Sequence, residues 1–221
     1  MGDAVVLHVD LTTDADREAQ ALAWLSDEER ERCSRFLYDG PRRRFALCRA
    51  ALRAVLCDRL GCSNRELAIG EQEFGKPYAA LGGEMATISF NVSHSGDHGL
   101  IAYAPDGWLG VDIEERSARR SLRELIETTL TPVEREELGS GSDQQRLHSF
   151  LKLWTIKEAF IKAIGLGVSI SMSELEVPAA MRHGTTGGVF DLPQTPGVSW
   201  RLEDLGTERF AAAVAHEVGS K

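Results

Sequence analysis

The stretch from Phe150 to Gly165, FLKLWTIKEAFIKAIG, constrains the fold more than any other part of the sequence. Its apolar side chains fall within one broad arc when they are placed about 100° apart, as on a helix. A glycine follows the last of them, which is typical of a helix end. Because an apolar arc of this width must be buried, we expect the chain to pack around this helix as a globular protein.

Three charged residues of this helix call for an explanation. Glu158 and Lys162 are four residues apart, so they share one edge of the helix where the core meets solvent. Lys157 falls inside the apolar arc, where an unpaired ammonium is costly. In one interpretation Lys157 extends to solvent and Glu158 pairs with Lys162. In the other, the helix carries a site that handles negative charge, with a carboxylate beside it.

Composition excludes several classes of function. A net charge of −9 argues against a nucleic-acid-binding protein, which needs a basic surface. No apolar run approaches the roughly 20 residues of a membrane span, and we expect neither a signal peptide nor a membrane partner. The cysteines form no zinc or CxxC pattern, so we expect reduced thiols in a cytoplasmic protein. They are Cys33, Cys48, Cys57 and Cys62.

Two acidic residues follow a strand pattern near the middle of the chain. In residues 108–114, Val111 and Ile113 face one side, while Asp112 and Glu114 project from the other about 7 Å apart. Adjacent carboxylates repel each other unless a cation lies between them, and hard oxygen ligands suit Mg²⁺. Two acidic residues with this spacing also occur by chance in many strands. A metal role therefore needs support from elsewhere in the chain.

A strand expected at residues 88–93 directs Ile88, Phe90 and Val92 inward, with Ser89, Asn91 and Ser93 outward. His94 ends this strand, and residues 99–103 return as its hairpin partner. A single histidine there is either a satisfied structural side chain or a ligand.

Basic residues in the first half suggest an anion site. Residues 26–29 form a capping box, a turn is expected at 39–41, and Arg42, Arg43 and Arg44 then lead into a helix that stops at Gly61. The three arginines are either a solvated basic face or a dock for phosphate. Lys76, between a glycine and a proline, sits on a rigid corner.

The two halves of the chain look alike. Each has a long apolar helix that ends at a glycine, Gly61 or Gly165, followed by strands and a final Ala-rich strand. Strands are expected at 170–177, 188–192, 198–205 and 210–216, and short helices at 121–126 and 132–138. We predict an α+β fold made of two similar subdomains, residues 1–110 and 111–221. The active site is expected at their interface.

The segment GVDIE at 110–114, followed by WTIKEAFIK at 154–162, resembles the paired signature of the 4′-phosphopantetheinyl transferases. Further blocks match the Sfp-type branch in the same order: RF at 35–36, RRRF at 42–45, GKP at 75–77 and NVSHS at 91–95. The resemblance covers roughly residues 32 to 167. It implies the fold of that family, a pseudo-twofold pair of similar α+β subdomains in one monomer.

The resemblance also implies a reaction. Members of this family transfer the phosphopantetheine arm of coenzyme A to a serine of an acyl or peptidyl carrier protein and release adenosine 3′,5′-bisphosphate. The implied partners are carrier domains of polyketide, non-ribosomal peptide or fatty-acid synthases. The implied cofactor is Mg²⁺, with coenzyme A as co-substrate.

The residues that the resemblance assigns to this reaction fall into three groups. Asp112, Glu114 and Glu158 would hold Mg²⁺, and Glu158, directly or through a metal-bound water, would be the base. Lys157 and Lys162 would meet phosphate oxygens, with Lys162 also counted as catalytic. The adenosine and 3′-phosphate end of coenzyme A would be bound by Arg44, Lys76, Ser93 and His94.

Two other functions use the same residues. A hydrolase of coenzyme A would employ the same carboxylates with water as the nucleophile. A non-catalytic binding module would retain the fold alone, although every acidic ligand position is filled.

Overall fold

The computed structural model describes residues 3–72, 75–117, 122–139, 141–165 and 170–220 of the chain. Helices and strands alternate irregularly along it, as expected for an α+β protein. In order they are β1 (Val5–Asp10), α1 (Ala15–Trp24), α2 (Asp27–Ser34), α3 (Asp39–Leu60), β2 (Leu67–Glu71), β3 (Pro77–Leu81), β4 (Glu84–Met85), β5 (Ser89–Ser95), β6 (His98–Ala104), β7 (Leu109–Glu115), α4 (Leu122–Thr129), α5 (Pro132–Leu138), α6 (Asp143–Ile164), the 3₁₀ turn η2 (Met172–Glu174), α7 (Ala179–Arg182), β8 (Gly187–Asp191), β9 (Val198–Asp204) and β10 (Phe210–Ser220).

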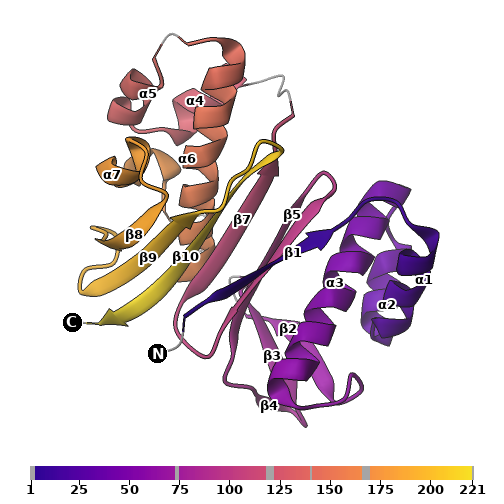
Figure 1. Cartoon of the computed structure of the whole chain (residues 1–221). Helices are drawn as coiled ribbons and strands as arrows, with labels where there is room; N and C mark the ends of the chain where they lie inside the picture. The colour runs from indigo at the N-terminus through magenta and orange to yellow at the C-terminus, as the bar shows by residue number, and fades with distance from the viewer. Residues whose placement is uncertain (1–2, 73–74, 118–121, 140, 166–169, 221) are drawn as a thin grey trace.

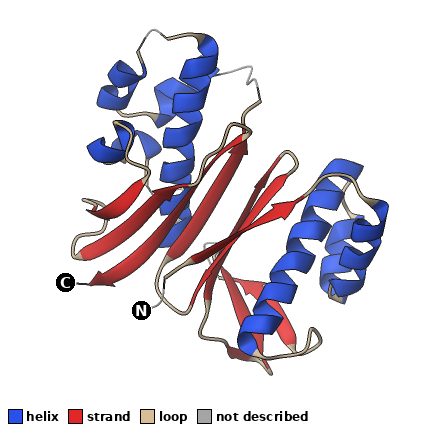
Figure 2. Cartoon of the chain, viewed as in Figure 1, coloured by secondary structure: helices blue, strands red, loops and turns tan. Residues whose placement is uncertain are grey.

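The described strands form three antiparallel sheets. Their orders are β1-β6-β5, β7-β10-β9-β8 and β2-β3-β4. Figure 2 shows the first two sheets side by side in the middle of the molecule, with α1, α2 and α3 at one end and α4 to α7 at the other. The helices therefore cover the outer sides, and the two sheets meet between them.

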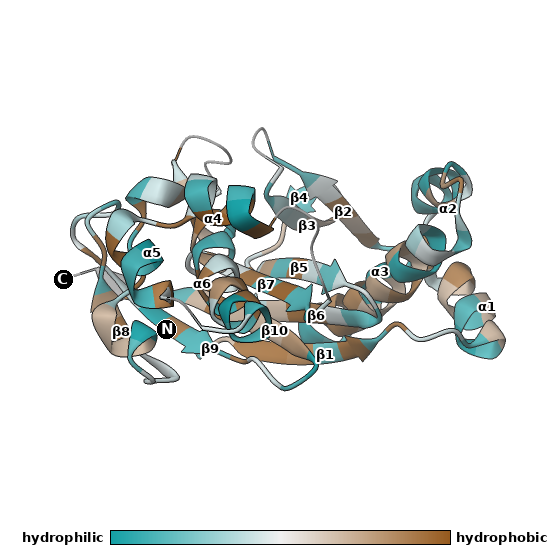
Figure 3. Ribbon diagram, turned by 90° about the horizontal axis from the view of Figure 1, so that it is seen from above, coloured by the Kyte–Doolittle hydropathy of each residue, from teal (hydrophilic) through white to brown (hydrophobic). Residues whose placement is uncertain are grey.

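The meeting line of the two sheets runs between β5 and β7, which lie alongside each other (Figure 1). Asn91 of β5 accepts a hydrogen bond from the backbone N–H of Val111 of β7, at 3.1 Å through Oδ1. Apolar side chains of β6, β7 and β10 pack together on one side of this line. In the view of Figure 3 hydrophobic colour follows these inner strands, while the helices carry more hydrophilic colour.

Asn91 and Ser93 were expected to point outward, yet both are buried. A strand of a single sheet would leave that face to solvent, but here β7 covers it. The alternation of β5 was predicted correctly, and the environment of its polar face was not.

The two longest helices, α3 and α6, have the same length and the same kind of end. Each has 22 residues and stops at a glycine in the left-handed region, Gly61 with φ 63° and Gly165 with φ 72°. Each packs on the sheet of its own half. The predicted boundary between residues 110 and 111 falls inside β7, and the division into two subdomains stays a prediction.

Gly110 sets the distance between α6 and β7. A Cβ atom at this position would lie 2.1 Å from the Ala159 carbonyl oxygen and 2.4 Å from the Ala163 nitrogen. Only a residue without a side chain permits this approach. Asp112, two residues further along β7, lies on the same face of the strand and therefore also faces α6.

Two local predictions were wrong. The turn expected at residues 39–41 is the first turn of α3, because Pro41 is tolerated where helix N–H groups have no intrahelical partner. The strand expected at 170–177 is, where described, the turn η2 and extended chain without a strand partner. Its polar backbone groups bond side chains instead, including Met172 O with Lys157 and Val177 N with Glu134.

The helix at the centre of the sequence prediction is confirmed, and it begins earlier than its apolar run. Ser142 and Gln145 form a capping box that starts α6 at Asp143. Among the described helices, none combines the length and the apolar character that crossing a membrane requires.

Candidate active site

Asp112, Ser93 and Lys162 come together from three elements at the meeting line of the sheets. Lys162 Nζ of α6 lies 2.6 Å from Asp112 Oδ1 of β7 and 3.1 Å from Ser93 Oγ of β5. Ser93 Oγ donates to the same oxygen of Asp112 at 2.8 Å. The other carboxylate oxygen, Asp112 Oδ2, is buried and has no hydrogen-bond partner among the described residues. Asp112 therefore holds one cation and keeps one oxygen available for another.

Two further carboxylates lie near Asp112. Glu114 follows on β7 and accepts a hydrogen bond from Ser95 Oγ at 2.8 Å. Glu158 precedes Lys162 by one helical turn. Burial raises the pKa of Glu158, and the negative charges of Asp112 and Glu114 raise it further, while Lys162 opposes them. The three acids that the resemblance grouped therefore act on one another electrostatically.

Burial also raises the pKa of Asp112, against the opposing influence of Lys162 and Ser93. The side chain is 6% exposed. A carboxylate in such a place is incompletely compensated, and a further cation would lower its free energy.

The carboxylates are not arranged as a ready metal site. Within the described part of the chain, no group of three or more His, Cys, Asp or Glu side chains has the geometry to hold a metal ion. The donors nevertheless fit a hard divalent cation, since they are carboxylate oxygens. One of them, Asp112 Oδ2, has no hydrogen-bond partner in the part of the chain that the structure describes.

A pocket of about 330 Å³ adjoins this cluster. Lys162 lines it and also pairs with Asp112, so the pocket and the carboxylates share one ammonium group. Its wall includes residues of α2, α3, β2, the 75–77 corner and β5: Arg32, Phe45, Cys48, Arg49, Leu52, Glu71, Gly75, Pro77, Asn91, Val92 and His94. The pocket thus combines positive charge with an aromatic surface, which suits an anionic ligand that carries a flat ring.

Two residues assigned to the 3′-phosphate, His94 and Arg44, differ in their relation to this pocket, because Arg44 is not among its lining residues. His94 lines it, and partial burial lowers the pKa of its imidazole, with the nearby Arg44 and Lys162 adding to the effect. Of the other two arginines of the run, Arg42 pairs with Asp39. Arg43 pairs with Asp97 and donates a hydrogen bond to the Leu11 carbonyl. Arg44 is the arginine of this run whose charge lowers the pKa of His94.

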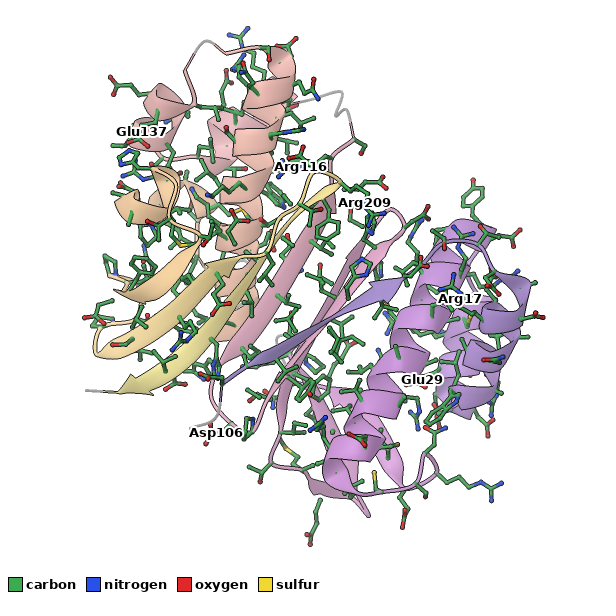
Figure 4. All side chains as sticks on the ribbon, in the orientation of Figure 1. Arg17, Glu29, Asp106, Arg116, Glu137 and Arg209 are labelled. Carbon is green, nitrogen blue, oxygen red and sulfur yellow. The ribbon has the colours of Figure 1, made fainter. Side chains whose placement is uncertain are left out.

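Sequence reasoning did not single out Arg32 and Arg49. Their guanidinium carbons lie 5.2 and 5.8 Å from the centre of the Phe45 ring. Arg49 is four residues after Phe45 in α3, and this spacing is the signal that would have placed it on the same face. Glu29 of α2, labelled in Figure 4 where α2 meets α3, lies 3.6 Å from Arg49 Nε and 3.2 Å from Arg53 Nη1.

The prediction that Lys157 meets phosphate oxygens is wrong. Its side chain is fully buried, and its ammonium donates to Glu134 Oε2 at 2.5 Å and to Thr129 O and Met172 O at 2.9 Å each. The helix wheel correctly placed Lys157 in the apolar arc. Its anionic partner is a carboxylate of this chain, supplied by α5.

The structure does not bring Lys76 into the pocket. Its ammonium donates to the Ala163 carbonyl near the end of α6 at 3.0 Å. Its side chain lines another concavity of about 580 Å³, together with Trp108 and Gly165. Gly75 and Pro77, on either side of it, line the pocket instead. A shared phosphate site of Lys76 with Arg44 and His94 is not supported by this arrangement.

A larger concavity, about 1090 Å³, lies between the end of β7, α4, α5 and the first half of α6. None of the site residues predicted from the sequence lines it. Its lining includes Arg116, Arg123, Arg135 and Arg146. The larger volume of this concavity does not make it the active site, because the carboxylates lie elsewhere. We therefore place the active site at the carboxylates and the adjoining pocket.

Comparison with known protein families identifies two matching segments. Residues 109–215 match the 4′-phosphopantetheinyl transferase superfamily, and residues 13–106 match the 4′-phosphopantetheinyl transferase N-terminal family. The first segment contains the carboxylates and α6, and the second contains most of the adjoining pocket.

Individual relatives carry related names. A phosphopantetheinyl transferase of Thraustochytrium sp. is 32% identical over 215 residues, which cover 92% of this chain and 74% of that protein. A putative 4′-phosphopantetheinyl transferase of Synechocystis sp. is 35% identical over 153 residues, 69% of this chain and 62% of that protein. The 4′-phosphopantetheinyl transferase of Bacillus subtilis is 28% identical over 171 residues, 77% of this chain and 74% of that protein. This chain belongs to the 4′-phosphopantetheinyl transferase family.

Proposed function

We propose that this protein transfers the 4′-phosphopantetheine group of coenzyme A to a serine hydroxyl of an acyl or peptidyl carrier protein, in a reaction that depends on Mg²⁺. The observation that carries the proposal is the double role of Lys162, which lines the cationic pocket and pairs with Asp112 of the carboxylate cluster. A pyrophosphate lying across Lys162 would have its nucleotide end in the pocket and its reacting phosphorus at the carboxylates.

Asp112, Glu114 and Glu158 are the residues that would hold Mg²⁺, which when bound neutralises pyrophosphate charge and stabilises the leaving bisphosphate. Asp112 Oδ2 supports this assignment, because no described residue bonds it. The chain's own contribution is mainly positioning and charge neutralisation, as in other phosphoryl transfers.

Glu158 is the proposed general base for the carrier serine. A carboxyl in water is a weak base, but burial and its acidic neighbours raise the pKa of Glu158 and strengthen it as a proton acceptor. Lys162 lies beside the same cluster and would hold a phosphate oxygen. The proton passes from the serine hydroxyl to Glu158 while the serine oxygen attacks phosphorus and the bond to the bisphosphate breaks.

The nucleotide end of coenzyme A is assigned to the pocket. His94 in the wall, and Arg44, whose charge acts on His94, would bind the 3′-phosphate, with Arg32 and Arg49 beside Phe45 adding positive charge along the wall. Arg44→Ala should therefore weaken coenzyme A binding while leaving binding of dephospho-coenzyme A, which lacks that phosphate, nearly unchanged. Equal losses for the two ligands in calorimetric titration would remove Arg44 from the phosphate site.

The carrier partner is proposed from family membership. We expect an acyl or peptidyl carrier domain of a polyketide, non-ribosomal peptide or fatty-acid synthase. The protein would act as a cytoplasmic monomer.

The deciding experiment incubates the protein with MgCl₂, coenzyme A and each of a panel of apo-carrier domains, then weighs each carrier by mass spectrometry. A mass gain equal to phosphopantetheine on one carrier supports the proposal. Free bisphosphate with an unmodified carrier identifies a hydrolase of coenzyme A. If neither a modified carrier nor free bisphosphate forms, the protein is a binding module. Asp112→Asn is the matched control, because it removes one charge and preserves the shape of the side chain.

A further inference from the structure

The ammonium of Lys162 lies among oxygen atoms in the manner of a bound cation. Asp112 Oδ1, Ser93 Oγ and the Val111 carbonyl surround it at 2.6, 3.1 and 3.5 Å. We propose that Lys162 is the built-in counter-ion of the carboxylate cluster in the metal-free protein, and that it must leave Asp112 when a divalent ion binds. This inference rests on the proposed metal role of Asp112.

Burial explains why the cluster needs such a counter-ion. Asp112 is 6% exposed, and Glu158 and Glu114 add negative charge beside it. Without a cation, these acids would repel one another in a poorly solvated place. Lys162 supplies one positive charge, and Ser93 supplies a hydrogen bond to the same oxygen. The arrangement also gives a reason why the described acidic residues do not form a ready metal site: an ammonium group is already bound there.

Lys162 is able to leave because its side chain is partly open to solvent. It is 31% exposed, whereas Asp112 is 6% exposed. The same side chain lines the neighbouring pocket, so its ammonium has a second place to go. Lysine carries its charge on a flexible four-carbon stem, which suits a group that moves between two anions. Binding of a divalent ion to the acids would thus turn Lys162 toward the pocket, where the pyrophosphate is expected.

The exchange predicts that removing Lys162 has opposite effects on metal binding and on coenzyme A binding. Lys162 competes with the divalent ion for Asp112, so its removal should tighten metal binding in the absence of coenzyme A. In the proposed function it also holds a phosphate oxygen of coenzyme A, so its removal should weaken binding of that ligand. Removing a lysine that only stabilises the fold, or that only binds phosphate, would not tighten metal binding.

The test is a calorimetric titration of the full-length protein with MnCl₂, and separately with MgCl₂, at low salt and without coenzyme A. Lys162→Met should bind either ion roughly tenfold more tightly than the wild type, the size expected when one charge-assisted hydrogen bond no longer competes. Lys162→Arg keeps the cation and should bind as weakly as the wild type. Lys152→Met is the matched control, because Lys152 lies on the same helix but pairs with Asp204 at 3.1 Å, outside the cluster.

Equal or weaker metal binding by Lys162→Met would overturn the proposal. Lys162→Gln serves the same purpose if the methionine variant does not fold. The wild type provides an independent check: the Nζ resonance of Lys162, followed by ¹⁵N NMR, should shift as MgCl₂ is added, and an unchanged resonance at saturation also overturns the exchange.

Failure of the exchange is distinguishable from failure of the proposed function. If the protein modifies a carrier but Lys162 has no effect on metal affinity, the proposed function stands and the exchange is refuted. If Lys162 controls metal binding but the protein modifies no carrier, the exchange stands and the proposed function fails.

Discussion

Lys157 Nζ lies 2.5 Å from Glu134 Oε2, and both side chains are fully buried. The ammonium also bonds the carbonyls of Thr129 and Met172, and Glu134 accepts from the backbone N–H groups of Thr131 and Val177. The pair therefore ties α6 to the end of α4, to α5 and to the chain around η2. It holds α6 from the side away from Asp112.

Lys157→Met should destabilise the protein by about 3–5 kcal/mol, because it leaves Glu134 as a buried carboxylate without its cation. Burial already lowers the pKa of Lys157 against the opposing influence of Glu134, so the ammonium itself is costly to bury. The measurement is urea unfolding at neutral pH. The double variant Lys157→Met/Glu134→Gln should recover part of the loss, since neither buried charge remains. A stable Lys157→Met protein that has lost coenzyme A binding would instead restore the phosphate role expected from the sequence.

Glu158→Gln should reduce transfer by a factor on the order of 10²–10⁴, the usual contribution of a positioned base. The amide has nearly the same shape but accepts no proton. Coenzyme A should bind with an affinity much closer to that of the wild type, because Lys162 and the pocket are intact. Single-turnover transfer followed by mass spectrometry gives the first quantity and titration calorimetry the second. Unchanged turnover would refute the assignment of Glu158 as base.

Gly110→Ala should push α6 away from β7 and cost about 1–3 kcal/mol, as overpacking typically does. The new Cβ would meet backbone atoms of Ala159 and Ala163, which have no rotamer to change. Because Asp112 and Lys162 belong to the two displaced elements, transfer should fall as well. Gly141→Ala is the control, since its closest neighbour is the flexible side chain of Gln145 at 3.2 Å. Equal unfolding midpoints for the two variants would contradict the packing argument.

His94 should make the stability of the protein fall as the solution becomes acidic. The pKa of the folded-state imidazole is below its ordinary value of 6.5 because of partial burial, Arg44 and Lys162. As the pH drops through about 6.5, the unfolded chain takes up a proton that the folded chain resists, so the free energy of unfolding decreases until the folded-state pKa is passed. His94→Gln should lose this part of the pH dependence. Superimposable urea midpoints for the two proteins between about pH 8 and pH 5 would show that His94 does not contribute.

Much of the local structure was predictable from the sequence because it depends on neighbours along the chain. The capping box at Ser26, the helix ends at Gly61 and Gly165, and the short helix at 132–138 all follow from residues a few positions apart. The failures share a different cause. Residues 170–177 have apolar residues suited to a strand, but their backbone groups bond Lys157 and Glu134 from distant segments.

The sequence by itself determined the family, the α+β elements and the acids on β7 and α6, because these are patterns of residue type and spacing. Tertiary structure decided which cation meets which anion. Lys157 and Lys162 are five residues apart on one helix, yet the first is buried against Glu134 and the second faces Asp112. The physical reason is that a buried charge takes its partner from whatever packs against it, and only the folded arrangement of α5, β5 and β7 around α6 supplies those partners.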